Sequence, residues 1–118
     1  LYAKQNVPIL IGGGHDLVWS HYKALSQHFQ KIGIINIDAH FDLRESSSIH
    51  SGSAFYLIQE DCRQKQQTMS YLCLGIQSAS NTRTLFKRAE ECGVLYYDYL
   101  TCQNNPSLIQ RKIESYIE

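Results

Sequence analysis

Hydrophobic residues in this chain fall into two patterns, short unbroken runs and stretches in which they recur every three or four positions. Unbroken runs are typical of buried strands, and the wider spacing is typical of amphipathic helices. We therefore expect strands at 7–11, 32–37, 71–76 and 94–97, and helices at 16–30, 54–64, 82–92 and 106–117. Gly93 should end the third helix, and Pro106 should lie in the first turn of the last one.

The alternation of strands and helices predicts an α/β fold. Strands joined through helices pair in parallel, with helices on both faces of the sheet. The run at 32–37 has no regular polar alternation, which indicates a strand covered on both faces. In such sheets ligands gather at the carboxyl ends of the strands, and that edge is where we expect a site.

Composition excludes several classes of function. The chain of 118 residues carries 11 basic and 11 acidic side chains, so no net positive field attracts nucleic acid or an acidic membrane surface. No apolar run approaches the roughly 20 residues of a membrane span. The four cysteines have no paired metal-ligand spacing, which fits a reduced, cytoplasmic environment. Arg83, Lys87 and Arg88 recur at helical spacing and are expected to form a solvated face.

The segment 38–42, with the sequence Asp-Ala-His-Phe-Asp, closes the apolar run at 32–37. In an extended backbone, side chains two residues apart share a face, so Asp38, His40 and Asp42 should project together. Two carboxylates and an imidazole suit a hard-to-borderline divalent metal. The alternative is an acidic turn at the end of a strand, which does not require the intervening histidine.

A second ligand-like element, Gly-Gly-Gly-His-Asp at 12–16, follows the run at 7–11. The glycines allow the backbone to approach a site closely. A phosphate-binding loop is the alternative, but the Walker and dinucleotide spacings are absent. Because both elements follow expected strands of one parallel sheet, we expect His15 to meet the 38–42 segment in a single site.

These motifs, with His-Ser-Gly at 50–52, resemble the first two metal motifs and the following active-site loop of the ureohydrolase superfamily. That superfamily includes arginase, agmatinase and formimidoylglutamase. The form Asp-Ala-His-Phe-Asp-Leu-Arg at 38–44 most resembles formimidoylglutamase, since arginases and agmatinases usually have Thr at the position of Phe41.

The resemblance implies a three-layer α/β/α fold and two manganese ions that support hydrolysis of an amidine or guanidine C–N bond. It implies that His15 and Asp42 bind one ion, that His40 binds the other, and that Asp38 bridges them. His50 resembles the family's active-site histidine, which could shuttle a proton to the leaving group. A surface histidine in a serine-rich loop is the alternative.

Arg44, two residues beyond Asp42, could bind a substrate carboxylate through a bidentate pair. A surface salt bridge is the competing interpretation. The implied substrate is N-formimidoyl-L-glutamate, cleaved to L-glutamate and formamide. Agmatine, arginine and guanidino acids are the alternative substrates, and the implied enzymes commonly form homo-oligomers.

The sequence also departs from the family pattern. A third motif, Ser-x-Asp-x-Asp-x-x-Asp, is absent from residues 1–118, and 50–55 reads His-Ser-Gly-Ser-Ala-Phe instead of the usual His-Ser-Gly-Thr-Pro-Phe. Residues 1–118 are therefore expected to be a partial ureohydrolase domain, roughly its middle third, inactive in isolation. The alternative from another class is a catalytically silent fragment that binds a metal or a partner.

Overall fold

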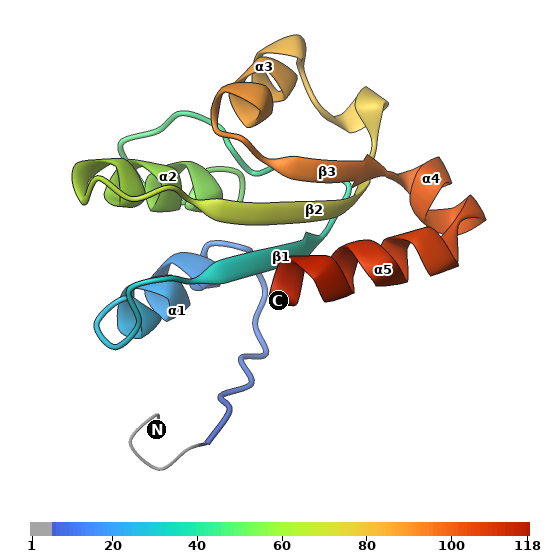
Figure 1. Ribbon diagram of the computed structural model, residues 1–118. Helices are drawn as coiled ribbons and strands as arrows, with labels where there is room; N and C mark the ends of the chain where they lie inside the picture. Colours follow the sequence, from blue (N-terminus) through green and yellow to red (C-terminus); the bar gives the residue numbers. More distant parts are fainter. Residues whose placement is uncertain (1–5) are drawn as a thin grey trace.

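The computed structural model describes residues 6–118, in which three strands form one parallel sheet in the order β1-β2-β3 (Figure 1). Strand β2 is central, pairing Ile35 with Leu72 on one side and Leu95 with Leu72 on the other. The elements in chain order are α1 (Leu17–Leu25), β1 (Gly33–Ile37), α2 (Ala54–Gln64), β2 (Ser70–Ile76), η2 (Ser78–Ser80), α3 (Arg83–Glu91), β3 (Leu95–Asp98), α4 (Tyr99–Asn104) and α5 (Pro106–Ile117).

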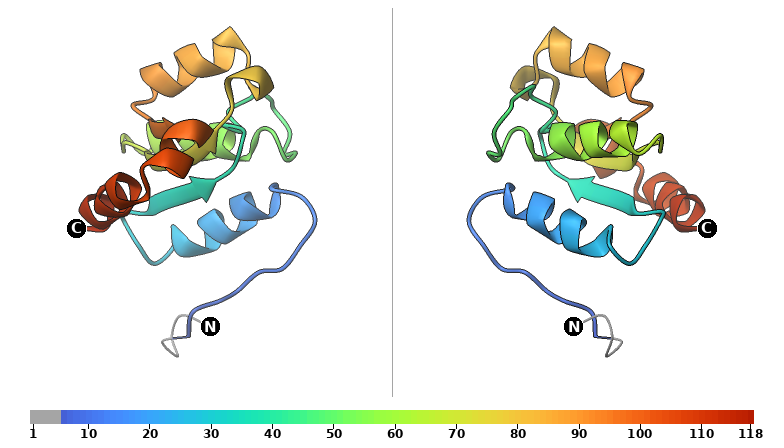
Figure 2. Two further views of the ribbon diagram at one scale, coloured as in Figure 1. Left: turned by 90° about the vertical axis from the view of Figure 1, so that its right-hand side faces the viewer. Right: turned by 90° about the vertical axis from the view of Figure 1, so that its left-hand side faces the viewer.

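Helices cover the sheet from both sides, which confirms the α/β prediction (Figure 2). On one side, helices α1, α2 and α3 pack on a core that includes Phe41, Ile58 and Tyr71. On the other side, α4 and α5 pack on a smaller cluster around Leu72 and Leu74. Both clusters lie mainly over β2, since its alternate side chains face opposite layers.

Local sequence signals account for most helix boundaries. Helix α3 begins where the Thr82 hydroxyl accepts a hydrogen bond from the Leu85 amide, and it ends before Gly93, whose φ of +67° suits a residue without a Cβ. Helices α2 and α5 span the predicted ranges, with Pro106 in the first turn of α5. Helix α4 was not predicted; Asp98 caps it by accepting from the Thr101 amide at 2.7 Å.

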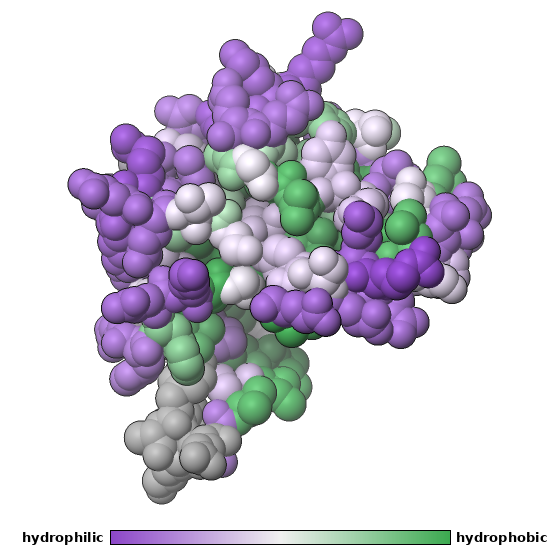
Figure 3. All heavy atoms as spheres, viewed as in Figure 1, coloured by the Kyte–Doolittle hydropathy of each residue, from purple (hydrophilic) through white to green (hydrophobic). Residues whose placement is uncertain are grey.

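Three predictions about the N-terminal third were wrong. Residues 7–11 form no strand and stay exposed: Val7 is 86% and Ile11 95% accessible (Figure 3, lower end of the view). An apolar run becomes a strand only where a neighbouring strand accepts its backbone hydrogen bonds. Helix α1 ends at Leu25 instead of residue 30. Strand β1 is not covered on both faces, since Ile37 is 83% exposed while the polar Asn36 is buried.

Asn36 is buried because it has a hydrogen-bond partner, which removes the cost of burying an amide. Its Nδ2 donates to the Tyr71 hydroxyl at 3.0 Å.

Within residues 6–118, no helix is long and apolar enough to cross a bilayer. Cys62, Cys73, Cys92 and Cys102 are all free thiols. Burial raises the pKa of the Cys73 thiol to about 12, so it stays protonated at neutral pH.

One polar cluster joins α1 to α2. The Asp61 carboxylate accepts from Lys23 Nζ at 2.8 Å, from Lys65 Nζ at 2.6 Å and from the Tyr22 hydroxyl at 2.9 Å. Burial disfavours the charged carboxylate, but these donors outweigh burial and hold the pKa of Asp61 at about 2. The cluster ties α1, the helix that follows His15, to α2.

We expect Asp61→Asn to lower the free energy of unfolding by about 1–2 kcal/mol at pH 7. The folded-state pKa lies below the ordinary 3.8, so the stabilisation is complete above about pH 4 and disappears as the pH falls toward 2. Urea denaturation of both proteins across this range measures the difference. Glu60→Gln is the control on the same helix, because Glu60 pairs with the exposed Arg63. A difference that persists at pH 2 would contradict this account.

Candidate metal centre

His15 lies at the turn that leads into α1. The Val18 amide donates to the His15 carbonyl at 3.2 Å, and the Leu17 amide donates to the Gly14 carbonyl at 3.4 Å. A Cβ at Gly12 would meet the end of the Leu17 side chain, so the glycine lets Leu17 pack closely against this loop. The His15 ring meets Phe55 of α2 edge to face, with 5.2 Å between ring centroids. This buried phenylalanine supports one side of the imidazole.

The segment 38–42, which carries the candidate ligands, lies beyond the end of β1 and is not part of the strand. Strand β1 ends at Ile37, residues 38 and 39 form a bend, and Asp42 has a φ of +49°. The prediction of an extended strand end was therefore wrong in its backbone. The alternation of burial nevertheless survives: Phe41 and Leu43 are fully buried, whereas Asp38, His40 and Asp42 retain exposure. Aspartate tolerates the left-handed region better than most residues.

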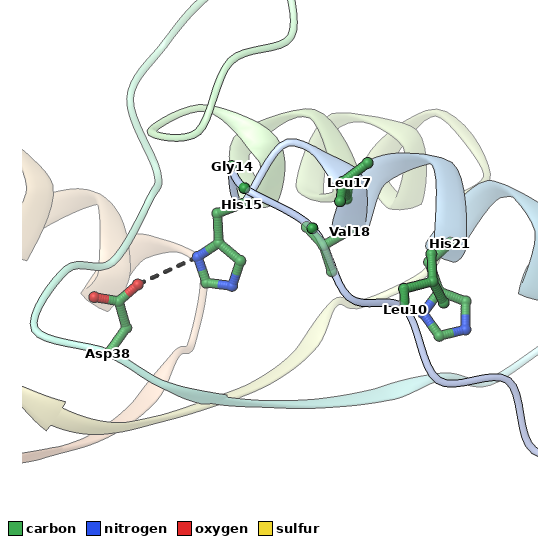
Figure 4. Close-up of a pocket in the computed structure, with 9 residues that line it drawn as sticks. Leu10, Gly14, His15, Leu17, Val18, His21 and Asp38 are labelled. Atoms are coloured by element: carbon green, nitrogen blue, oxygen red, sulfur yellow. Dashed lines mark ion pairs between the residues drawn. The ribbon is translucent and has the colours of Figure 1, made fainter.

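The structure brings His15, Asp38 and Asp42 together although they come from two loops. His15 Nδ1 lies 2.8 Å from Asp42 Oδ2 and 3.2 Å from Asp38 Oδ2. One possible ligand atom from each of the three residues lies within 4.8 Å of the others. His40 Nδ1 lies 3.3 Å from the other oxygen of Asp38, which places His40 beside this group. Figure 4 shows the His15 ring directed toward Asp38.

The electrostatics of this group favour a cation. Burial raises the pKa of Asp42 above its ordinary value; the hydrogen bond from His15 opposes that rise and the nearby charge of Asp38 adds to it. Two carboxylates held side by side repel each other. A divalent ion would offset both the burial and the repulsion, because hard carboxylate oxygens and imidazole nitrogens are ligands that such ions accept.

A hollow of about 460 Å³ adjoins the group between the glycine-rich loop and the end of β1 (Figure 4). His15 and Asp38 lie on its polar side, and Leu10, Leu17 and Val18 supply apolar lining. The site is therefore open on the side where a small molecule could approach the carboxylates.

His50 and Arg44 each contact Gly52 at a second turn, and neither belongs to the three-residue group. The Gly52 amide donates to His50 Nδ1 at 3.2 Å, which favours the tautomer with its proton on Nε2. The Arg44 amide donates to the Gly52 carbonyl at 2.9 Å, and a Cβ at Gly52 would lie only 3.1 Å from Arg44 Cδ. Among the described residues, the Arg44 guanidinium forms no ion pair, in contrast to the salt-bridge alternative.

Sequence reasoning missed the residues that hold the 38–45 loop. Asn81 and Tyr71 bind its backbone at residues 39 and 41. Arg88, expected on a solvated face, instead donates to the Leu43 carbonyl at 2.7 Å and to Glu45 at 2.8 Å. A lone Asn between a strand and a helix was the available signal for Asn81, but nothing local indicates the partner of Arg88.

Comparison with known proteins shows the family to which this chain is similar. The model of the arginase family matches residues 1–118. Formimidoylglutamase of Vibrio vulnificus (strain CMCP6) is 43% identical over 108 residues, covering 79% of this chain and 32% of that protein. Formimidoylglutamase of Staphylococcus carnosus (strain TM300) is 40% identical over 121 residues, covering 99% of this chain and 38% of that protein.

The crystal structure of formimidoylglutamase from Bacillus subtilis subsp. subtilis str. 168 superimposes with a TM-score of 0.78. It is 21% identical, and the match covers 93% of this chain and 35% of that one, so it supports the fold. The chain spans about a third of the length of the curated relatives it matches. Since the family model matches every residue, the chain belongs to the arginase family.

Proposed function

We propose that the full-length protein carrying this chain is a hydrolase with two manganese ions that cleaves a C–N bond of an amidine, with N-formimidoyl-L-glutamate as its substrate. The observation that carries the proposal is the convergence of His15, Asp38 and Asp42 within 4.8 Å at the carboxyl end of β1. The names of the relatives support the choice of substrate.

The donor set fits two divalent ions. The two oxygens of Asp38 face different imidazoles, Oδ2 toward His15 at 3.2 Å and Oδ1 toward His40 at 3.3 Å. A carboxylate with a histidine at each oxygen suits a residue shared by two ions, with Asp42 and His15 on one of them. Ions held by these residues would supply Lewis acidity, which would polarise an electrophilic carbon and lower the pKa of a nearby water.

The remaining residues suit substrate binding and proton transfer. Water oxygen adds to the formimidoyl carbon, the bond from that carbon to the glutamate nitrogen breaks, and the nitrogen takes up a proton. The products are L-glutamate and formamide. The Nε2–H edge of His50 can hydrogen-bond the reacting group, and the unpaired Arg44 guanidinium can bind a substrate carboxylate beside it.

The proposal is tested by assaying the manganese-loaded full-length protein on N-formimidoyl-L-glutamate, agmatine, L-arginine and a guanidino acid. Turnover of the first at a kcat/KM well above the others is expected. Preference for agmatine would contradict the substrate assignment and leave the metal site standing. No turnover together with no manganese binding would favour a silent fragment and overturn the proposal.

Arg44→Ala should raise KM for N-formimidoyl-L-glutamate roughly 10- to 100-fold, because a charge-assisted hydrogen bond to a carboxylate is typically worth about 1.5–3 kcal/mol. Steady-state kinetics measure the change, and kcat should move much less. Arg63→Ala is the matched control, since Arg63 pairs with Glu60 on the exposed face of α2. An unchanged KM would remove Arg44 from the binding site.

A further inference from the structure

The backbone of residues 38–42 lies beyond the end of β1, where two main-chain hydrogen bonds continue the sheet pairing: the Asp38 amide donates to the Leu74 carbonyl and the Gln77 amide donates to the Ala39 carbonyl, each at 3.0 Å. The Asn81 side chain adds to this pairing and extends it to residue 41. Its Nδ2 donates to the Ala39 carbonyl at 2.8 Å and to the Gln77 carbonyl at 2.9 Å. Its Oδ1 accepts from the Phe41 amide at 3.1 Å. One side-chain amide therefore binds the main chain on both sides of His40.

We infer that Asn81 is a positioning residue for the metal centre, an inference that rests on the proposed function. Asn81 holds residues 39 and 41, which alternate along the chain with Asp38, His40 and Asp42, so it fixes the backbone that carries these three side chains. Contacts of this kind, one step removed from metal ligands, orient those ligands and commonly affect metal affinity.

The rest of the molecule makes this role separable from core packing. Phe41 is anchored independently: its ring is fully buried and meets Phe86 and Tyr96 edge to face, each at 5.1 Å between centroids. The Tyr71 hydroxyl donates to the Phe41 carbonyl at 3.0 Å. Asn81 itself is only half-buried. Its removal leaves these anchors in place, so the loop should lose its orientation while the core stays folded.

Two substitutions in the full-length protein separate the possible causes. Asn81→Ala removes all three hydrogen bonds without adding charge. Asn81→Asp keeps the oxygen that accepts from the Phe41 amide. It replaces the donating Nδ2 with an oxygen that faces the carbonyl oxygens of Ala39 and Gln77. A new negative charge near a cation site would by itself tighten cation binding. Weaker binding by Asn81→Asp therefore cannot be an effect of charge.

We expect isothermal titration with manganese chloride to show a dissociation constant about 10- to 100-fold higher for both variants than for the wild type. Hydrogen exchange of the metal-free proteins supplies a second readout. In Asn81→Ala, the Phe41 amide should exchange faster, whereas amides of β2 should keep their protection. The control is Asn105→Ala, because the Asn105 side chain donates to the Thr101 carbonyl at 3.4 Å, between α4 and α5 and away from residues 38–42.

Each outcome has one consequence. Manganese affinity of Asn81→Ala within about 3-fold of the wild type overturns the inference. Equal acceleration of exchange at Phe41 and throughout β2 also overturns it, because Asn81 would then support the fold as a whole. A wild-type protein that binds no manganese overturns the proposed function, and this inference falls with it.

Discussion

Asp38→Ala in the full-length protein should abolish binding of at least one manganese ion and reduce kcat by more than about 100-fold. Asp38 faces both His15 and His40, at 3.2 and 3.3 Å, so its loss removes an oxygen from each half of the proposed centre. Replacing residues that merely support metal ligands typically costs about 10–100-fold, and a ligand should cost more. Metal content after dialysis and steady-state kinetics measure both effects.

Asp16→Ala is the matched control for this substitution. Asp16 neighbours His15 in sequence, but it does not belong to the group of possible ligand atoms formed by His15, Asp38 and Asp42. It should retain manganese and most of the activity. Retention of two ions by Asp38→Ala would contradict the shared-ligand role, even if activity fell.

His50→Ala should lower kcat by about 10²–10⁴-fold, the usual contribution of a positioned proton donor or acceptor. Manganese affinity should stay unchanged, because His50 lies outside the three-residue group and its Nδ1 already accepts from the Gly52 amide. Kinetics and metal titration on the same preparation separate the two effects. Loss of manganese would make His50 a ligand or a structural residue instead.

His50→Gln refines the interpretation of that result. Glutamine offers an N–H donor but cannot take up and release a proton at neutral pH. Recovery of most activity by His50→Gln would assign a hydrogen-bonding role, and failure to recover would assign proton transfer. His28→Ala removes an imidazole beyond the end of α1 and should leave kcat unchanged.

The sequence alone was sufficient for the elements whose signals are local. Helix α2 and helix α5 were predicted with their observed bounds. Helix α3 begins at the Thr82 hydroxyl, which accepts from the Leu85 amide, and ends before Gly93, which has a positive φ. The residue types and spacing at 12–16 and 38–42 also predicted that His15 would meet Asp38, on the expectation that both segments follow strands of one parallel sheet, although residues 7–11 form no strand. The structure brings these side chains together.

Tertiary contacts decided what local pattern could not. Residues 7–11 have the composition of a strand but no partner, and Ile37 of β1 is exposed because no helix covers that face there. The Asp42 carboxylate reaches His15 through a left-handed turn, not through strand alternation.

Asn81 and Arg88 hold the 38–45 loop, although they lie 40 or more residues away from their partners in the chain. A strand needs a neighbouring strand, a buried amide needs a hydrogen-bond partner, and a loop needs contacts that hold its backbone. Other parts of the chain have to supply each of these partners. Hydrophobic periodicity carries no information about that partner. The sequence therefore determined which residues are candidates for the site, and the tertiary structure decided how their backbone is held.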